Sequence, residues 1–448
     1  MLKITHYSNS FIVIKSENSS IVCDPWIGKT TDNGWYSYPI VNNRDVDKEV
    51  FNSKFIYVSH IHCDHIDPKT LKKFKNKDLT FIIKKFSNGV LKRRLQRLFP
   101  KLKVIEIDPF KKTKLNKDFT VVIIPQIMSN TSNLPDNIQY DMDTSILIQS
   151  NKSKEVFYNN VDMPIDLKIL KKINNFSKNK LKNKINIFCY GLGAACEFPQ
   201  CFLNINRTKV QKKLTNESIV KLKNFLKYLK PDIYFPAGGT YAIYGKFYKL
   251  NKYIAQPSFK KIKSATSKLK TKVCNIIGGG SIIYKNSDFL IKETSYELAD
   301  ISDKRFIQHI KNLDYYYKKK NNKINLKKLD NFFDKAKKNY FRILANKKGI
   351  NTKWDIFFKI YKKYEINKNC FIDKKKSNLL KIYQLSNHDL SSNNTHKLEC
   401  HLEYDLFESL LKGRFPWNTS LTGSTILYKR NPNVFNVDLQ FSLNFLRA

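Results

Sequence analysis

The chain has 448 residues and a formal net charge of +43, with 42% hydrophobic and 13% aromatic residues. This length suits one large domain with a smaller second one, and the hydrophobic content excludes a mainly disordered chain. So large a positive charge is typical of proteins that bind nucleic acid. Only ten of the 81 basic residues are arginine, however, and the lysines are scattered among asparagine and isoleucine. Because bidentate phosphate recognition prefers arginine, compositional drift explains the charge better, and nucleic-acid binding stays a less favoured alternative.

Cysteine usage and hydropathy bear on the compartment. The eight cysteines form no Cys-x-x-Cys pair and no regular framework, which favours a reducing environment. The first residues lack the apolar core of a signal peptide, and no run approaches the roughly eighteen apolar residues of a membrane span. We therefore expect a cytoplasmic protein without a membrane span.

The first part of the chain predicts strands leading into a histidine-rich loop. Residues 4–16 and 20–23 alternate like two strands and end at Asp24-Pro25-Trp26. Taken alone, Asp24 is as compatible with a plain turn as with a functional role. A second apolar run, 55–58, then leads directly into the loop, and Pro68 opens an expected helix over 68–77 because proline suits a first helical turn.

The loop reads V-S-H-I-H-C-D-H-I-D over residues 58–67. Imidazole and carboxylate groups are ligands that suit zinc, iron or manganese. His60 and His62 alternate along extended backbone and are expected to point the same way, toward one metal. Asp64 and His65 can turn toward a second position. We interpret the loop as a metal site, with zinc as the first expectation and iron or manganese as the alternatives.

Further strand-like runs alternate with helix-like ones, which suggests sheets covered by helices. Runs at 144–149 and 155–159 are flanked by Asp143 and Asp162, and Asp143 is expected to orient a ligand or a water. Small residues follow the runs at 185–190 and 232–235, where strand ends form pockets. The expected substrate-pocket residues are Gly193, Phe198, Pro199, Gly238 and Gly239.

Near residue 290 the character of the sequence changes. We assign residues 1–290 to a metal-binding domain and 291–448 to a helix-rich accessory domain, with helices expected over 296–318, 326–345 and 404–411. The accessory domain is expected to cover the pocket or to form a homodimer over it. Its histidines His388, His396 and His401 lack metal-ligand spacing and are interpreted as structural.

The spacing His-x-His-x-Asp-His after a hydrophobic strand resembles the signature of the metallo-β-lactamase fold superfamily. This resemblance implies an α/β fold of the αβ/βα sandwich type and a hydrolase that uses one or two metal ions. It also implies that Asp24 supports a ligand histidine from outside the metal's own ligands, and that Asp162 is a ligand that bridges two metals. The implied metal ligands are His60, His62, Asp64, His65 and Asp162.

The order of several short motifs narrows the resemblance. These motifs resemble the non-Rieske portion of CMP-N-acetylneuraminate hydroxylase and its bacterial relatives, and more distantly ascorbate-6-phosphate lactonase. They are Asp24-Pro25-Trp26, the metal loop, Asp141-Met142-Asp143-Thr144, Val161-Asp162, the segment 193–199, Ile233-Tyr234 with Pro236, and Trp417-Asn418 with Gly423-Ser424.

Two departures from this family matter. A Rieske cluster needs Cys-x-His followed by Cys-x-x-His, and the sequence contains no Cys-x-x-His, so the chain alone is not expected to be a monooxygenase. In addition, no histidine lies between His65 and His309, where the superfamily takes further ligands. Gln139, Tyr140 and Asp141 are the nearest substitutes.

These observations predict a metal-dependent hydrolase acting on a small anionic substrate, such as a sugar phosphate or a nucleotide sugar of sialic-acid-like metabolism. Asp64 and Asp162 are the expected catalytic carboxylates, with Asp64 accepting a proton. The alternatives are an RNA or DNA nuclease or phosphodiesterase, and a non-catalytic partner protein that binds a nucleotide sugar. Because later histidine ligands are lacking, we expect one tightly held metal ion per chain.

Overall fold

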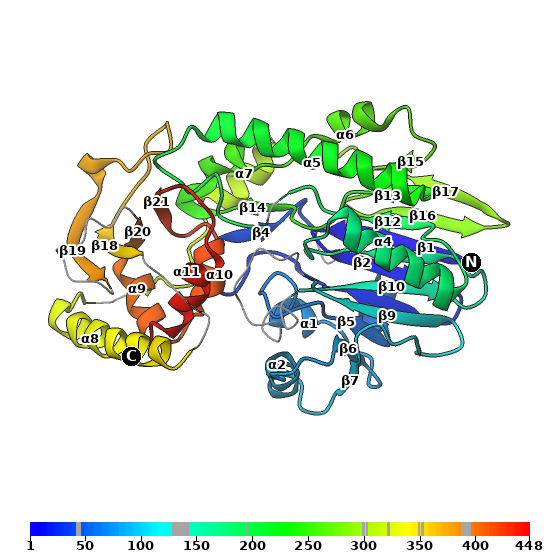
Figure 1. The fold of residues 1–448 in the computed structure, drawn as a ribbon, viewed down its shortest axis with the longest axis horizontal. Coiled ribbons are helices and arrows are strands. Elements are labelled where there is room, and N and C mark those ends of the chain that lie inside the picture. Colours follow the sequence, from blue (N-terminus) through cyan, green and yellow to red (C-terminus); the bar gives the residue numbers. More distant parts are fainter. Residues whose placement is uncertain are drawn as a thin grey trace.

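The computed structural model describes residues 1–41, 46–127, 143–193, 195–297, 301, 303–319, 323–347, 350, 354–386 and 396–448. Two large sheets lie face to face on one side of the molecule, and the C-terminal region lies beside them (Figure 1). The Asp141 and His388 predictions fall outside the described residues, as do those for Gln139 and Tyr140.

The first sheet has eight strands in the order β17-β16-β1-β2-β3-β5-β6-β7. Its last four strands run parallel, so their carboxyl ends meet at one edge of the sheet. The strand bounds are β1 Leu2–Ser8, β2 Phe11–Lys15, β3 Ser20–Cys23, β5 Phe55–Tyr57, β6 Thr80–Lys84, β7 Lys103–Ile107, β16 Gly280–Lys285 and β17 Asp288–Lys292.

The second sheet has seven strands in the order β15-β13-β12-β11-β10-β9-β8. Strands β11, β12, β13 and β15 are parallel, while β8, β9 and β10 pair antiparallel with their neighbours. The bounds are β8 Thr113–Lys114, β9 Phe119–Pro125, β10 Thr144–Ser150, β11 Val156–Asn159, β12 Ile187–Cys189, β13 Ile233–Phe235 and β15 Lys272–Val273.

Three hydrophobic clusters fill the spaces between the two sheets and between each sheet and the helices that cover it. One lies between the sheets and joins residues such as Ile14 and Ile123. Another lies between the second sheet and α4 (Leu167–Phe176), α5 (Arg207–Leu229) and α6 (Phe259–Thr266). The third lies between the first sheet and α1 (Pro68–Leu71) and α2 (Val90–Leu98). This helix–sheet–sheet–helix order confirms the predicted α/β sandwich.

The C-terminal region is built on a four-stranded sheet, β19-β18-β20-β21. Its strands are β18 Asp355–Lys363, β19 Asn378–Leu385, β20 Lys397–Glu403 and β21 Leu427–Asn431. Its helices are α7 Lys304–Lys311, α8 Leu326–Ala345, α9 Tyr404–Leu411, α10 Trp417–Thr422 and α11 Val437–Ser442. Short helical turns in the described part of the chain are Lys48–Asn52, Ser177–Leu181, Gly245–Tyr253, Lys374–Lys376 and Leu443–Phe445.

The core of the C-terminal region extends across the predicted boundary at residue 290. One cluster contains Trp35 and Tyr244 together with Phe407 and Trp417. Trp35 belongs to a small two-stranded sheet formed by β4 (Trp35–Ser37) and β14 (Tyr241–Ile243). Strand β17 ends at Lys292, two residues beyond the boundary. The division into two domains, like the homodimer, stays a prediction.

Two helices predicted from the sequence are shorter in the structure. The helix expected over 68–77 ends at Leu71, because the backbone N–H of Lys75 donates to Phe51 instead of continuing the helix. Among the residues of the range 296–318 that the structure describes, those of α7 are helical and the others are not. The side chain of Asp303 caps its N-terminus, and Tyr315 beyond it donates its hydroxyl hydrogen to the carbonyl of Tyr244.

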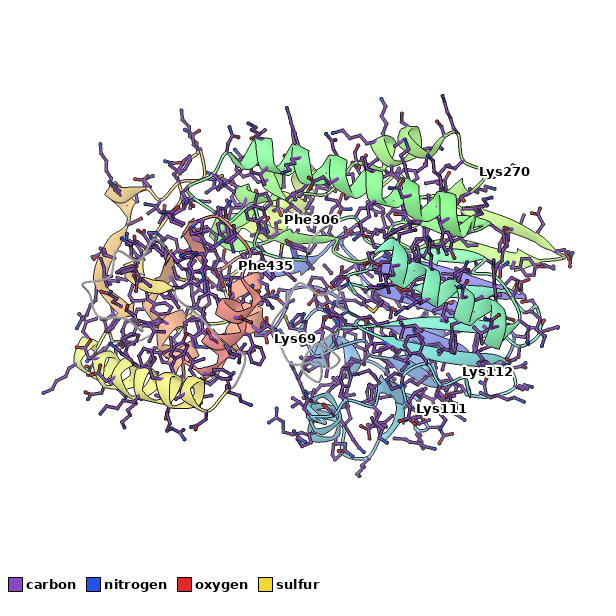
Figure 2. All side chains as sticks on the ribbon, viewed as in Figure 1. Lys69, Lys111, Lys112, Lys270, Phe306 and Phe435 are labelled. Atoms are coloured by element: carbon purple, nitrogen blue, oxygen red, sulfur yellow. The ribbon has the colours of Figure 1, made fainter. Side chains whose placement is uncertain are left out.

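The structure also describes the state of the cysteines and the character of the helices. All eight cysteines are free thiols. Within the part of the chain that the structure describes, none of the helices combines the length and the apolar character needed to cross a membrane. The neighbouring Lys111 and Lys112 lie on one part of the outer surface, and Lys270 lies on another part (Figure 2).

Candidate metal centre

The metal loop lies at the edge where parallel strands of both sheets end. It follows β5, and Asp24 follows the neighbouring strand β3, with its backbone N–H bonded to the carbonyl of Tyr57 at 3.0 Å. The side chain of Asp24 accepts a hydrogen bond from the backbone N–H of Ser59 at 2.8 Å, which fixes the start of the loop. Asp67 ends the loop by capping α1. The loop is therefore held at both ends.

His60 and His62 face one another at the floor of the site. Nε2 of His60 lies 2.9 Å from Nδ1 of His62, and 3.6 Å from a carboxylate oxygen of Asp143. The other nitrogen of His60 contacts the hydroxyl of Ser59 at 2.9 Å. Nε2 of His60 and Nδ1 of His62 thus lie close together and near Asp143. The backbone of residues 60–62 forms a bend, not the extended conformation that the sequence suggested.

His65 lies at the centre of three carboxylates. Its Nδ1 is 3.1 Å from Asp24, and its Nε2 is 3.2 Å from Asp64 and 3.0 Å from Asp162. Asp162 comes from the second sheet, where Val161 adopts a left-handed backbone conformation (φ 53°) just after β11. The contact between Asp24 and His65 is the kind of support that the resemblance implies for a ligand histidine.

Burial and charge act differently on the three histidines. Burial lowers the pKa of His60 to about 4, with a further contribution from the nearby His65. Burial also lowers the pKa of His62. For His65, burial favours the neutral ring, but the three carboxylates outweigh it and raise its pKa well above the ordinary value. His60 and His62 are therefore neutral at pH 7, which is the form that binds metal.

The donor set fits a divalent transition-metal ion. The site contains two groups of possible ligands, and within each group the donor atoms lie within 4.8 Å of one another. One group is His60, His65 and Asp162, and the other is His60, His62 and Asp143. In addition, Oδ1 of Asp64 is buried and has no hydrogen-bond partner among the described residues. Imidazole nitrogens with carboxylate oxygens are suitable ligands for zinc, iron or manganese. The two groups share His60.

A pocket of about 200 Å³ opens above these residues. Gly193 and Gly238 from the predicted pocket line it. Gly238 has φ 93°, and a Cβ there would lie 2.9 Å from the carbonyl oxygen of Val161, so only glycine fits. Its described lining residues are Trp35, His60, His62, Asp64, Asp143, Asn160, Val161, Asp162, Met163, Pro164, Tyr190, Gly191, Gly193, Ala195 and Gly238.

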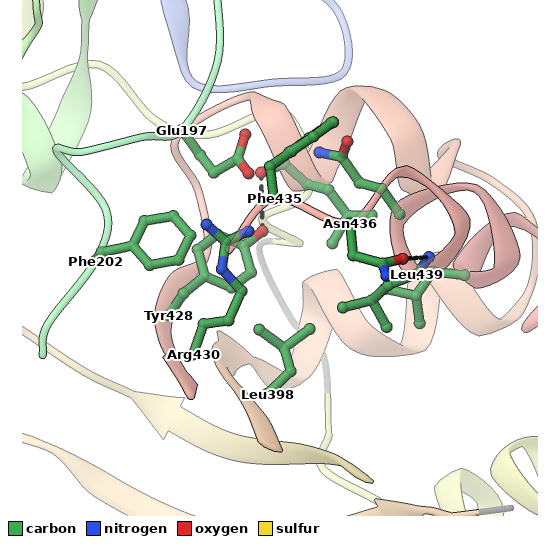
Figure 3. Close-up of a pocket in the computed structure, with 11 residues that line it drawn as sticks. Glu197, Phe202, Leu398, Tyr428, Arg430, Phe435, Asn436 and Leu439 are labelled. Carbon is green, nitrogen blue, oxygen red and sulfur yellow. Dashed lines mark hydrogen bonds between the residues drawn. The ribbon is translucent and has the colours of Figure 1, made fainter. Parts of the chain in front are cut away.

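The other predicted pocket residues lie elsewhere. Gly239 packs against the backbone of Gly193. Phe198 and Pro199 lie outside the pocket lining, on the side of the loop that faces the C-terminal region, where Phe198 contacts the ring of Phe202. Figure 3 shows a small cavity at this place, where Glu197, Arg430, Asn436 and Gln440 line the wall together with apolar and aromatic side chains. Burial raises the pKa of Glu197 to about 7.

This buried carboxyl predicts a pH-dependent stability. Because the pKa of Glu197 rises from 4.5 in the unfolded chain to about 7 in the fold, the folded state binds this proton more tightly. The stability that the protonated Glu197 carboxyl contributes to the fold is complete below about pH 4.5 and is lost as the pH rises through about 7. We expect Glu197→Gln to remove this loss, which is about 3 kcal/mol in the free energy of unfolding. Urea unfolding at pH 4.5 and pH 8 measures it.

The exposed Glu217 on α5 offers a matched control, since Glu217→Gln should leave the pH profile unchanged. A profile for Glu197→Gln that runs parallel to that of the wild type would contradict the prediction.

Several residues of the site have no clear signal in the sequence. Asn9 donates to the carboxylate of Asp64 at 3.2 Å and also accepts from the backbone N–H of Thr240. Trp35 stacks on Tyr241 at 4.1 Å and lines the pocket. Asn418 contacts His62 from the C-terminal region, and its motif with Trp417 is the one signal that pointed to this segment.

The chain was compared with known proteins. No protein-family model matches it. A Mycolicibacterium smegmatis protein named as a Rieske 2Fe-2S iron-sulfur protein is 31% identical over 98 residues, covering 22% of this chain and 18% of that protein. The cytidine monophosphate-N-acetylneuraminic acid hydroxylase of Xenopus laevis is 24% identical over 273 residues, covering 58% of this chain and 41% of the relative. The predicted resemblance is confirmed.

A solved structure of the metallo-β-lactamase fold protein YhfI from Bacillus subtilis is similar with a TM-score of 0.37 and 13% identity, covering 63% of this chain and 99% of that one. The chain spans less than half the length of the curated relatives cited above. What those proteins do as wholes therefore does not transfer to it as an observation.

Proposed function

We propose that this protein is a metal-dependent hydrolase acting on a small anionic substrate, with a nucleotide sugar as the first class to test. The observation that carries this proposal is the convergence of His60, His62, His65 and three pocket carboxylates below an open pocket of about 200 Å³. The hydroxylase relatives are named for a CMP-linked sugar, and this supports a nucleotide sugar as the substrate class.

The residues of the site would have two roles, holding the metal ion and accepting a proton. His60, His62 and His65 with Asp143 and Asp162 would hold the ion. A bound divalent ion supplies Lewis acidity and makes a water molecule acidic enough to act as a nucleophile near pH 7. Asp64 lines the pocket, and its Oδ1 accepts no hydrogen bond from the described residues, so it is available to take a proton. Asn9 holds the other oxygen of Asp64 in place.

The charge and the aromatic rings of the pocket lining indicate which kind of substrate the pocket suits. Lysine and arginine do not occur among its described lining residues, whereas Asp64, Asp143 and Asp162 do. An anionic group would therefore be attracted by the bound ion rather than by a basic wall. The rings of Trp35 and Tyr190 offer flat surfaces for a base or a sugar. This arrangement favours a small substrate over a nucleic-acid backbone, which needs several basic phosphate contacts.

We expect one tightly held metal ion per chain. Both donor groups need His60, and the Ser59 hydroxyl occupies the other nitrogen of that ring. Elemental analysis of freshly purified protein after extensive dialysis against metal-free buffer measures the number of ions and identifies the metal as zinc, iron or manganese. Two equivalents that survive dialysis would contradict this expectation.

The proposed activity is tested with the metal-loaded protein on nucleotide sugars, sugar phosphates and single-stranded RNA, with the His60→Ala variant as the inactive control. Release of product from the small substrates, and none from RNA, is the expected result. Cleavage of RNA with an affinity that falls steeply as salt rises would support the nuclease reading instead. Tight nucleotide-sugar binding by the metal-free protein without turnover would support a binding protein.

A further inference from the structure

The side chain of Asn418, in the C-terminal region, contacts the metal loop. Asn418 lies near the start of α10, and its amide nitrogen is 2.9 Å from Nε2 of His62. The two residues are 356 positions apart in the sequence. Among the described residues that the candidate metal centre brings together, Asn418 comes from furthest along the chain.

The backbone around Asn418 is firmly anchored. The neighbouring Trp417 is fully buried, and its indole N–H donates to the carbonyl of Leu446 at 2.8 Å. The backbone N–H of Asn418 itself donates to the side chain of Asn444 at 3.2 Å. The amide group is thus presented to His62 by a fixed support, which is what orientation of a metal ligand requires.

The turn after α10 is docked on the pocket wall. The backbone N–H of Gly34 donates to the carbonyl of Gly423 at 2.7 Å, and the indole N–H of Trp35 donates to Ser424 at 3.2 Å. A Cβ on Gly34 would lie 2.8 Å from that same carbonyl oxygen, so the two segments meet at the closest approach that glycine permits. Helix α10 cannot shift without moving Trp35.

The two nitrogens of His62 have different surroundings. Nδ1 faces His60 and the point where the donor atoms converge, whereas Nε2 faces Asn418. A ring nitrogen that binds metal carries no proton, so the proton of a ligating His62 has to be on Nε2. Nε2–H then needs an acceptor. A half-turn of the Asn418 amide places its oxygen where its nitrogen lies, and the oxygen accepts that hydrogen bond.

We propose that Asn418 is a positioning residue that holds His62 in the tautomer with Nδ1 free for metal, so that the C-terminal region completes the metal centre. This inference rests on the proposed function, because it concerns the same ion. It gives the C-terminal region a role at the site without making it a source of ligands.

The test compares three variants for metal affinity. Asn418→Ala removes the acceptor, Asn418→Asp keeps an oxygen at the same reach, and Thr422→Ala, on the same helix, is the matched control because its hydroxyl bonds the backbone of α10 and not His62. Metal-free protein is titrated with Zn²⁺ against a competing chelator, and with Co²⁺ while its visible spectrum is recorded. Urea midpoints of the metal-free proteins show whether the fold is retained.

We expect Asn418→Ala to bind metal about 10- to 100-fold more weakly and to alter the Co²⁺ spectrum. Asn418→Asp should bind at least as tightly as the wild type, and Thr422→Ala should be unchanged. Wild-type affinity in Asn418→Ala, or equal loss in Asn418→Ala and Asn418→Asp, would overturn the inference and leave the proposed function standing. A wild-type protein that binds neither ion would overturn the proposed function and this inference together.

Discussion

Replacing His60 by alanine is expected to lower metal affinity by about 100-fold or more, since a four-ligand zinc site contributes about 10–16 kcal/mol, or about 3 kcal/mol per ligand. His60 belongs to both groups of donor atoms, so no alternative set remains after its loss. Hydrolysis should fall with the bound metal. Because the ring sits on a loop at a strand end, the fold should be retained. Chelator competition and circular dichroism measure the two effects.

His309→Ala is the control for this variant, because the described hydrogen bond and ring contact of His309 are with Tyr36 of β4 and not with the metal loop. It should keep its metal. A His60→Ala protein that unfolds while its remaining folded fraction stays metal-loaded would identify the histidine cluster as structural instead.

His65→Ala is expected to destabilise the metal-free protein by about 3–5 kcal/mol, which is the usual cost of removing one partner from a buried charge cluster. His65 is fully buried and lies within 3.2 Å of three carboxylates. Without its positive charge, these carboxylates repel one another in a site that water reaches poorly. Urea unfolding of the metal-free wild type and variant measures the difference.

The double variant His65→Ala, Asp24→Asn tests the cause of this loss. Asparagine at position 24 keeps an oxygen for the backbone N–H of Ser59 but removes one of the unpaired charges. Part of the lost stability should therefore return. A double variant less stable than His65→Ala would show that packing, not charge, holds this part of the site together.

The sequence located the histidine and aspartate residues that cluster at the candidate site better than the residues that hold them in place. His60, His62, Asp64 and His65 follow one another within a single loop, so a short motif is enough to find them. Asp24 directly follows β3, whose parallel neighbour β5 leads into the metal loop, so its contact with His65 follows from the rule that parallel strands end at one edge of a sheet. Asp162 lies three residues beyond β11 of the other sheet, and its contact with His65 depends on how the two sheets pack.

Other parts could not be predicted because they depend on long-range packing. Asn9 is a common residue in unremarkable local sequence, and the motif Trp417-Asn418 locates its segment without indicating what Asn418 contacts. Each asparagine meets a partner far away in the chain. The placing of Phe198 beside Phe202, outside the pocket, depends on how the loop after β12 meets the C-terminal region. Hydrophobic periodicity reports local burial and contains no information on such pairings.

The docking of the segment around Gly423 on that around Gly34 also bears on how the protein is made. In this chain, Trp35 is synthesised 389 residues before its hydrogen-bond partner Ser424. The imidazole and carboxylate groups of the candidate centre all precede α10, so until α10 is made the pocket wall at Trp35 has no support from that side. The candidate site can therefore close only after α10 has been synthesised, long after the groups that line it.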